Sequence, residues 1–153
     1  MVSDAFTVLL VEDELADAAL FQEMLADVSP EITVEHVYHG GEALQYLLGK
    51  APYTGRPRPN LVVLDLNMPV MNGHEFLREV KGHEHLRALP VLVLSTSDRP
   101  QDVQRSYHGF ASGYVVKPGT YAEYTRVLTA VESYWRGVLR LPTIGDLVGG
   151  ELP

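Results

Sequence analysis

The sequence predicts an α/β fold, a doubly wound five-stranded parallel sheet with helices on both faces. Short, continuously apolar runs are typical of strands buried on both faces, and together with a mixed run at residues 32–37 they give five candidate strands along the chain. They alternate with segments whose apolar residues recur every three or four positions, as in βαβ units. The 153 residues are enough for one domain with an ordinary hydrophobic core.

The first two strands and helices lie before residue 50. Residues 7–11 are apolar almost throughout and predict the first strand, and apolar residues from Leu15 to Ala26 then fall at helical spacing. Ser29-Pro30 ends this helix, residues 32–37 form the second strand, and residues 41–48 form a short helix closed by Gly49. The three prolines and one glycine of residues 50–59 predict a loop.

The remaining strands and helices follow the same alternation. Strands are predicted at 61–64, 91–94 and 114–116, and helices at 73–81 and 102–107. The last helix begins at Tyr121, and its apolar residues step by three and four, which predicts one buried face. These residues are Tyr121, Tyr124, Leu128, Val131, Trp135 and Val138.

Chemically reactive side chains follow the strands. In parallel α/β sheets, ligands bind outside the carboxyl ends of the strands, where this chain places Glu12-Asp13, Asp65, Ser95 and Lys117. Carboxylates that converge stay ionised together only around a cation, and oxygen ligands without His or Cys favour Mg²⁺. A lysine and a hydroxyl beside them suit phosphoryl transfer, with an Asp as the nucleophile.

Composition excludes several other classes of function. The absence of cysteine rules out disulfides and thiolate metal sites, and it fits the reducing cytoplasm, where we expect the protein to act. The net charge of −8 and the lack of Lys/Arg runs argue against direct binding of nucleic acid. No apolar run approaches the ~20 residues that a membrane-spanning helix needs, so no membrane association is expected.

Four short motifs, each at the end of a predicted strand, carry a family resemblance. They are Val-Glu-Asp-Glu at 11–14, Leu-Asp-Leu-Asn-Met-Pro at 64–69, Ser95, and Gly-Tyr-Val-Val-Lys-Pro at 113–118. In this order, across residues 6–138, they resemble the receiver domain of two-component response regulators. The resemblance implies a flavodoxin-like fold and a phosphoprotein that accepts a phosphoryl group from a sensor histidine kinase.

The resemblance assigns a role to each motif residue. It implies that Asp65 is the phosphoacceptor, that Glu12 and Asp13 bind Mg²⁺ with Asp65, and that Asn67 gives the metal its backbone carbonyl. Asp13 is the expected direct ligand, whereas Glu12 acts directly or through water.

The resemblance carries further expectations. Ser95 and Lys117 would contact phosphoryl oxygens, and the Lys117–Pro118 bond would be cis. Tyr114 matches an aromatic switch position, whose ring moves inward as Ser95 turns toward the phosphate. Thr96 stands where many receivers have a smaller residue, and we hypothesise that its bulk, with that of Asn67, slows attack of water on the phosphoaspartate.

Three further sequence features resemble those of the stand-alone regulators paired with bacterial and cyanobacterial phytochrome kinases. They are the Pro-rich loop at 51–59, Ser-Thr-Ser at 95–97, and Tyr134-Trp135 followed by Leu141-Pro142. We expect a receiver domain over residues 1–139 and an apolar extension without an output domain over 140–153. The apolar tail residues are expected to pack on the last helix or on a second subunit, giving a homodimer. They are Val138, Leu139, Leu141, Ile144, Leu147 and Val148.

Other functions remain open at this point. A haloacid-dehalogenase-type hydrolase would place a second Asp where this chain has Asn67, and a flavodoxin-like electron carrier would not place acids after its first strand. A degenerate receiver serving as a constitutive binding module, and a phosphorelay shuttle to a histidine phosphotransfer protein, are further alternatives. We expect no enzymatic activity other than the protein's own phosphorylation and dephosphorylation.

Overall fold

The computed structural model describes residues 5–68 and 70–142. It contains the five strands and five helices that the sequence predicts, in alternating order. The strands are β1 (Phe6–Val11), β2 (Ile32–Val37), β3 (Leu61–Leu64), β4 (Val91–Ser95) and β5 (Gly113–Val116). The helices are α1 (Leu15–Val28), α2 (Gly40–Leu47), α3 (Gly73–Gly82), α4 (Pro100–His108) and α5 (Tyr121–Glu132).

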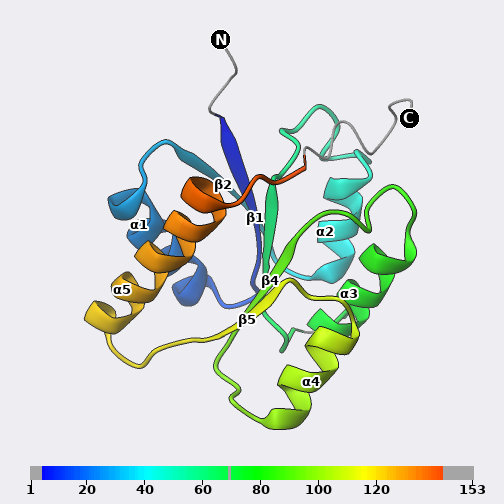
Figure 1. Cartoon of the computed structure of the whole chain (residues 1–153). Helices are drawn as coiled ribbons and strands as arrows, with labels where there is room; N and C mark the ends of the chain where they lie inside the picture. Colours follow the sequence, from blue (N-terminus) through cyan, green and yellow to red (C-terminus); the bar gives the residue numbers. More distant parts are fainter. Residues whose placement is uncertain (1–4, 69, 143–153) are drawn as a thin grey trace.

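The five strands form one parallel sheet in the order β2-β1-β3-β4-β5. The order reverses between β1 and β3, which brings the carboxyl ends of these two strands side by side. Figure 1 shows α1 and α5 on one face of the sheet and α2, α3 and α4 on the other. The predicted doubly wound arrangement is therefore confirmed.

The protein has two hydrophobic cores, one on each face of the sheet, because successive side chains along a strand point to opposite faces. In β1, Leu9 and Val11 belong to the core under α2 and α3, whereas Val8 and Leu10 belong to the core under α1 and α5. Successive side chains of a strand point to opposite faces, so a strand covered by helices on both sides must be apolar at every position. This requirement explains the continuous apolar runs.

The C-terminal helix differs from the prediction. The α-helix ends at Glu132, and a π-helical segment, η1, covers Ser133–Val138. Tyr124, Leu128 and Trp135 are buried as predicted, but Tyr121 and Val138 are exposed. Tyr121 is the first residue of the helix, at the margin of the core, and the wider π turn rotates the residues after Glu132 around the axis.

Tyr134 and Trp135 separate as adjacent helical residues should: Trp135 is 7% exposed and Tyr134 is 51% exposed. Beyond η1, Leu139 and Leu141 pack against the core under α1 and α5. The predicted tail residues Ile144, Leu147 and Val148 lie outside the described residues.

The expectation of a cis Lys117–Pro118 bond is wrong in this structure. Among the described residues, the cis peptide bond lies at Ala51–Pro52. Proline lowers the preference for the trans form to about 0.5–1 kcal/mol, so the residue pair alone cannot determine the isomer. Across the described ranges, no helix combines the length and the apolar character that crossing a membrane requires.

Candidate functional site

Three carboxylates converge where β1 and β3 end. The Asp65 backbone N–H donates to the Val11 carbonyl over 3.1 Å, which holds the two strand ends together. Oxygen atoms of Glu12, Asp13 and Asp65 all lie within 4.8 Å of one another. The structure thus brings together the three acidic residues that the sequence singles out.

The surroundings of Asp65 disfavour its charged form. Burial and the nearby Glu12 carboxylate raise the pKa of Asp65 to about 7, with Asp13 adding to the effect and Lys117 opposing it. Desolvation and like charge both penalise a carboxylate, and a cation among the oxygens would remove much of that penalty.

Lys117 provides the positive charge at this site. Its Nζ donates to Glu12 Oε1 over 2.7 Å and to Asp17 Oδ2 over 3.3 Å. Burial opposes the charged amine, but the hydrogen bond and charge of Glu12 raise the pKa of Lys117 overall. Lys117 is therefore a fixed cation beside Asp65, held through Glu12.

Ser95 lies next to Lys117 because β4 and β5 are neighbours. The Lys117 backbone N–H donates to the Ser95 carbonyl over 2.7 Å, and the fully buried Ser95 Oγ accepts from the Ser97 N–H over 3.1 Å. The Tyr114 hydroxyl donates to the Ser97 carbonyl over 2.8 Å. Ser95 and Tyr114 are thus connected through the same residue of the β4–α4 loop, Ser97.

The loop from β3 to α3 passes close to the acidic cluster. Asn67 is exposed in this loop and lines the same pocket as Asp13. Gly73 begins α3 against the loop backbone, where an added Cβ would lie 2.6 Å from the Asp65 carbonyl oxygen. Only glycine allows this approach, so Gly73 helps to position Asp65.

The donor set fits a hard divalent cation. The candidate ligands are carboxylate oxygens, and the cluster contains no imidazole or thiolate. One carboxylate oxygen of Glu12 accepts a hydrogen bond from Lys117, whereas Asp13 is exposed and so accessible to an ion. Glu12, Asp13 and Asp65 are the residues that could hold such an ion.

Sequence reasoning missed two residues of this site. Asp17 pairs with Lys117, and His36 Nε2 lies 2.7 Å from the Glu12 carbonyl oxygen. Asp17 lies in the first turn of α1, four residues after Asp13, and this nearness to the predicted acids could have indicated its place. His36 lies on the neighbouring strand β2, and nothing in its local sequence marks the contact.

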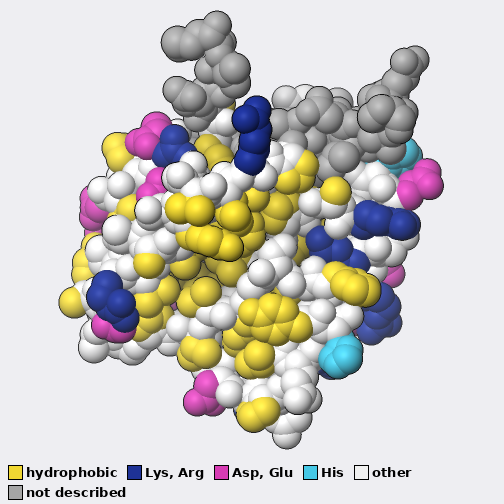
Figure 2. All heavy atoms as spheres, in the orientation of Figure 1, with side chains coloured by type: hydrophobic (Ala, Val, Ile, Leu, Met, Phe, Trp, Pro, Cys, Tyr) yellow, Lys and Arg dark blue, Asp and Glu magenta, His cyan; other side chains and the backbone are white. Residues whose placement is uncertain are grey.

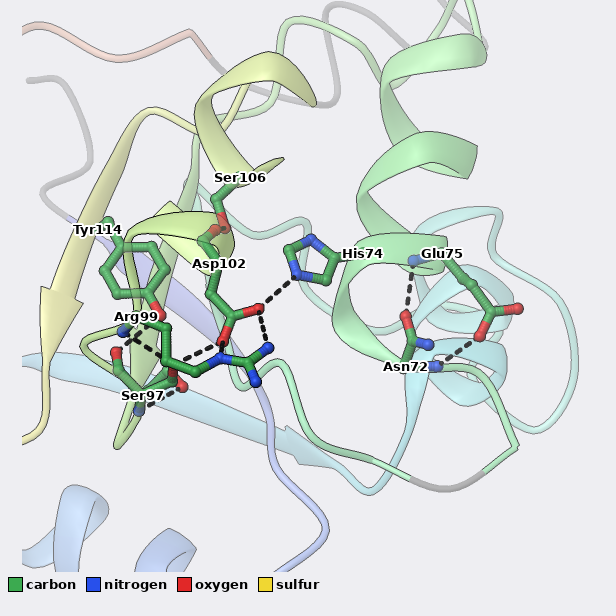
Figure 3. Close-up of polar contacts among 9 residues, drawn as sticks. Asn72, His74, Glu75, Ser97, Arg99, Asp102, Ser106 and Tyr114 are labelled. Atoms are coloured by element: carbon green, nitrogen blue, oxygen red, sulfur yellow. Dashed lines mark hydrogen bonds and ion pairs between the residues drawn. The ribbon is translucent and has the colours of Figure 1, made fainter. Parts of the chain in front are cut away.

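A second polar network, also missed, continues from Ser97 into α4 and α3. The Ser97 hydroxyl donates to Asp102 Oδ2 over 2.5 Å, and Arg99 Nε donates to the same oxygen over 3.2 Å. His74 Nε2, on α3, lies 3.7 Å from Asp102 Oδ1. Figure 3 shows Asp102 between Arg99 and His74, so this carboxylate links the β4–α4 loop to α3.

Comparison with known proteins decides the family. The response regulator receiver domain matches residues 8–129, which include the acidic cluster, Ser95 and Lys117. The chain belongs to the response-regulator receiver family. The order of the strands and the position of the acidic cluster in this receiver agree with that membership.

Relatives of this receiver include stand-alone phytochrome regulators. Response regulator Rcp1 of Synechocystis is 36% identical over 135 residues, covering 88% of this chain and 92% of Rcp1. A probable methanogenesis regulatory protein, FilR2 of Methanothrix harundinacea, is 37% identical over 91% of this chain and 89% of FilR2.

Solved structures give the same result for the fold. The phosphorylated cyanobacterial phytochrome response regulator RcpA matches with a TM-score of 0.85 and 36% identity, covering 90% of this chain and 99% of RcpA. The Mn²⁺-bound form of Rcp1 matches with a TM-score of 0.82 and 35% identity, covering 90% of this chain and 99% of that one. The resemblance to phytochrome regulators that the sequence indicates is therefore confirmed.

Proposed function

We propose that this receiver accepts a phosphoryl group from a sensor histidine kinase onto Asp65, with Mg²⁺ bound, and relays the signal by a change of conformation or oligomeric state. The observation that carries the proposal is the convergence of Glu12, Asp13 and Asp65 at the carboxyl ends of β1 and β3.

The chemical step is an in-line displacement at phosphorus. A carboxylate oxygen of Asp65 forms the new O–P bond as the bond from phosphorus to the donor nitrogen or oxygen breaks, and the leaving atom keeps the electron pair. Lys117 lies beside Asp65 to pair with a phosphoryl oxygen, and the Ser95 hydroxyl can donate to another.

The metal site would be formed by Asp13, Asp65, the Asn67 carbonyl and Glu12, the last directly or through water. When bound, Mg²⁺ would neutralise the carboxylates and the phosphoryl oxygens. The Mn²⁺-bound structure of the relative Rcp1 supports a divalent cation in this receiver. The raised pKa of Asp65 supports it as well, since a cation favours the ionised nucleophile.

The switch would involve Ser95 and Tyr114. Turning Ser95 Oγ toward a phosphoryl oxygen breaks its hydrogen bond from the Ser97 N–H. The Ser97 carbonyl accepts from Tyr114, so movement of the loop also releases the Tyr114 hydroxyl. Phosphorylation would then shift an existing equilibrium between two arrangements of this region.

The proposed partners are proteins. The phytochrome relatives support a kinase of the phytochrome type. Apolar side chains gather over α5, β5 and α4 on the face drawn in Figure 2, and they support a homodimer. The exposed large apolar residues of α4, β5, α5 and η1 are Tyr107, Val116, Tyr121, Tyr134 and Val138. We also propose that residues 140–153 extend the receiver of 1–139, since Leu141 packs against its core.

The test is the mass of the intact protein after incubation with acetyl phosphate, with and without Mg²⁺. We expect a gain of one phosphoryl group (~80 Da) in the wild type that requires Mg²⁺ and is absent in Asp65→Asn. Asp98→Asn, a change of an exposed carboxylate in the β4–α4 loop, should phosphorylate normally. No gain from acetyl phosphate or from a cognate kinase would instead favour a constitutive binding module.

A further inference from the structure

A pocket of about 430 Å³ opens between α3 and α4, apart from the acidic cluster. Basic side chains dominate its lining: Arg78 and Lys81 from α3, and Arg105 and His108 from α4. No lining residue in the described part of the chain is acidic. Figure 2 shows Lys and Arg side chains with a histidine on the side where Figure 1 places α3 and α4.

The Arg and Lys side chains of this pocket lack acidic partners within the described ranges. The side chains of Arg78 and Arg105 form no hydrogen bond or ion pair there, although the chain carries 20 acidic and 12 basic residues. Lys81 Nζ donates to the carbonyls of Arg87 and Leu89, over 2.9 and 2.7 Å, and to no carboxylate. Burial lowers the pKa of Lys81 to about 8, so the unpaired charge of the pocket lies mainly on Arg78 and Arg105. Cations without carboxylate partners in an acidic protein form a local positive field that favours an anionic ligand.

His74 provides a second, independent indication of a ligand. Its side chain is 10% exposed and lines the pocket, yet neither ring nitrogen has a hydrogen-bond partner in the described structure. Nε2 faces Asp102, whereas Nδ1 has neither a hydrogen-bond partner nor an ion-pair partner. A buried polar atom without a partner is unfavourable, and a polar atom of a bound ligand would satisfy it.

Phe110 lies at the rim of the pocket in a conformation that its side chain disfavours. Its φ is 71°, in the left-handed region, directly after Gly109 ends α4. Glycine is the usual residue at this position after a helix, because a Cβ is strained there. The phenylalanine is 72% exposed, so core packing does not compensate for the strain. Such outliers cluster at ligand sites.

We propose that the α3–α4 pocket binds a nucleotide, an anionic phosphate ester that carries a planar ring. Arg78 and Arg105 suit phosphate oxygens, since each guanidinium group can donate to two of them at once, and Lys81 adds positive charge nearby. The exposed ring of Phe110 offers a face on which a base can stack. The volume lies within the range of small-molecule sites, roughly 300–1,000 Å³.

The proposal can be tested by calorimetric titration of the full chain with adenosine and guanosine diphosphate at physiological ionic strength. Divalent cations are omitted, so that phosphate does not bind through a metal at the acidic cluster. We expect one nucleotide per chain, bound at least tenfold more tightly than inorganic phosphate. Failure of both nucleotides to bind, or affinity equal to that for inorganic phosphate, would overturn the proposal.

Two variants separate binding from folding. Arg105→Ala should weaken nucleotide binding about tenfold, as expected for loss of a charge-assisted contact. Phe110→Gly should weaken binding while leaving the melting temperature unchanged or higher, because glycine relieves the backbone strain. Arg126→Ala, on the exposed side of α5, is the matched control and should bind normally. Unchanged affinity in both pocket variants, or a lower melting temperature in Phe110→Gly, would contradict the assignment.

Discussion

Asp65 links the chemistry of the site to the pH dependence of stability. Its pKa is about 7 in the folded protein, whereas an unperturbed Asp has a pKa of about 3.9. Below about pH 4, Asp65 is protonated in both the folded and the unfolded protein. No buried charge then destabilises the fold, and the contribution of neutral Asp65 to stability is fully present. Between about pH 4 and 7 the folded state holds a proton that the unfolded state has released, so stability falls as pH rises.

Asp65→Asn should remove this dependence in metal-free protein. At pH 8 we expect the variant to melt about 3–6 °C above the wild type, since the buried like charge is gone. At pH 4 the difference should largely disappear. Melting curves followed by circular dichroism at both pH values check this, and an equal difference at pH 4 and pH 8 would disprove it.

A second prediction concerns Thr96 and the lifetime of the phosphoaspartate. It is exposed beside the buried Ser95, where its bulk can limit the access of water to the phosphoaspartate. Thr96→Ala should speed loss of the phosphoryl group about three- to tenfold, equivalent to about 1 kcal/mol of barrier. Thr129→Ala, exposed on α5, serves as the control, and equal lifetimes in both variants would remove the hypothesis.

The sequence predicted the position of a site residue where that residue directly follows a recognisable strand. Glu12, Asp13, Asp65 and Lys117 lie at the ends of recognisable strands, and parallel strands end at one edge. The pairing of Asp17 with Lys117 could not be predicted in the same way, because these residues are 100 positions apart. The network around Asp102 depends on how α3 packs against α4, which local patterns do not encode.

The start of α3 is the element most tightly coupled to the site. Gly73→Ala should lower the free energy of unfolding by about 1–3 kcal/mol, since the new Cβ would overlap the Asp65 carbonyl oxygen and the Leu66 backbone. We also expect slower phosphorylation by acetyl phosphate, because the displaced loop carries Asp65.

Gly82→Ala provides a matched control at the other end of α3, where an added Cβ meets nothing within 4 Å. Denaturant unfolding and phosphorylation rates should be near normal in this variant. Similar losses of stability and of phosphorylation rate in the two glycine variants would contradict the role assigned to the close contact between Gly73 and the Asp65 carbonyl oxygen.

Elements were predictable to within a few residues, except where their ends depend on specific contacts. The start of α2 is fixed by His39, whose Nδ1 accepts from the N–H groups of Gly41 and Glu42. The predicted last helix extends to Val138, but its end adopts π geometry in the structure. The apolar spacing alone does not distinguish these forms, since Trp135 is buried in either case.

At the scale of the molecule, the exposed apolar face predicts self-association. Val116 on β5 and Tyr121 on α5 are exposed, as is Val138 in η1. We expect a symmetric dimer in light scattering. A chain ending at residue 142 should dimerise more weakly, because it lacks the apolar residues Ile144, Leu147 and Val148. A monomer at every concentration, with and without phosphorylation, would contradict the proposed dimer.

The overall topology accounts for the site. Reversal of strand order between β1 and β3 places Asp65 beside Glu12 and Asp13, and the neighbouring β4 and β5 add Ser95 and Lys117. Sequence patterns predicted this arrangement because buried parallel strands are continuous apolar runs. The α3–α4 pocket was not predicted, because its cations are spread over two helices that become neighbours only in the fold.

The most direct test of phosphoryl transfer to Asp65 is to locate the modified residue chemically. The receiver is loaded with acetyl phosphate and Mg²⁺ and reduced with borohydride, which converts an aspartyl phosphate to homoserine, and its peptides are then sequenced by mass spectrometry. Homoserine at position 65, dependent on Mg²⁺, is the predicted result. Homoserine at Asp13 or another carboxylate, with Asp65 unmodified, would contradict the assignment of Asp65 as the acceptor.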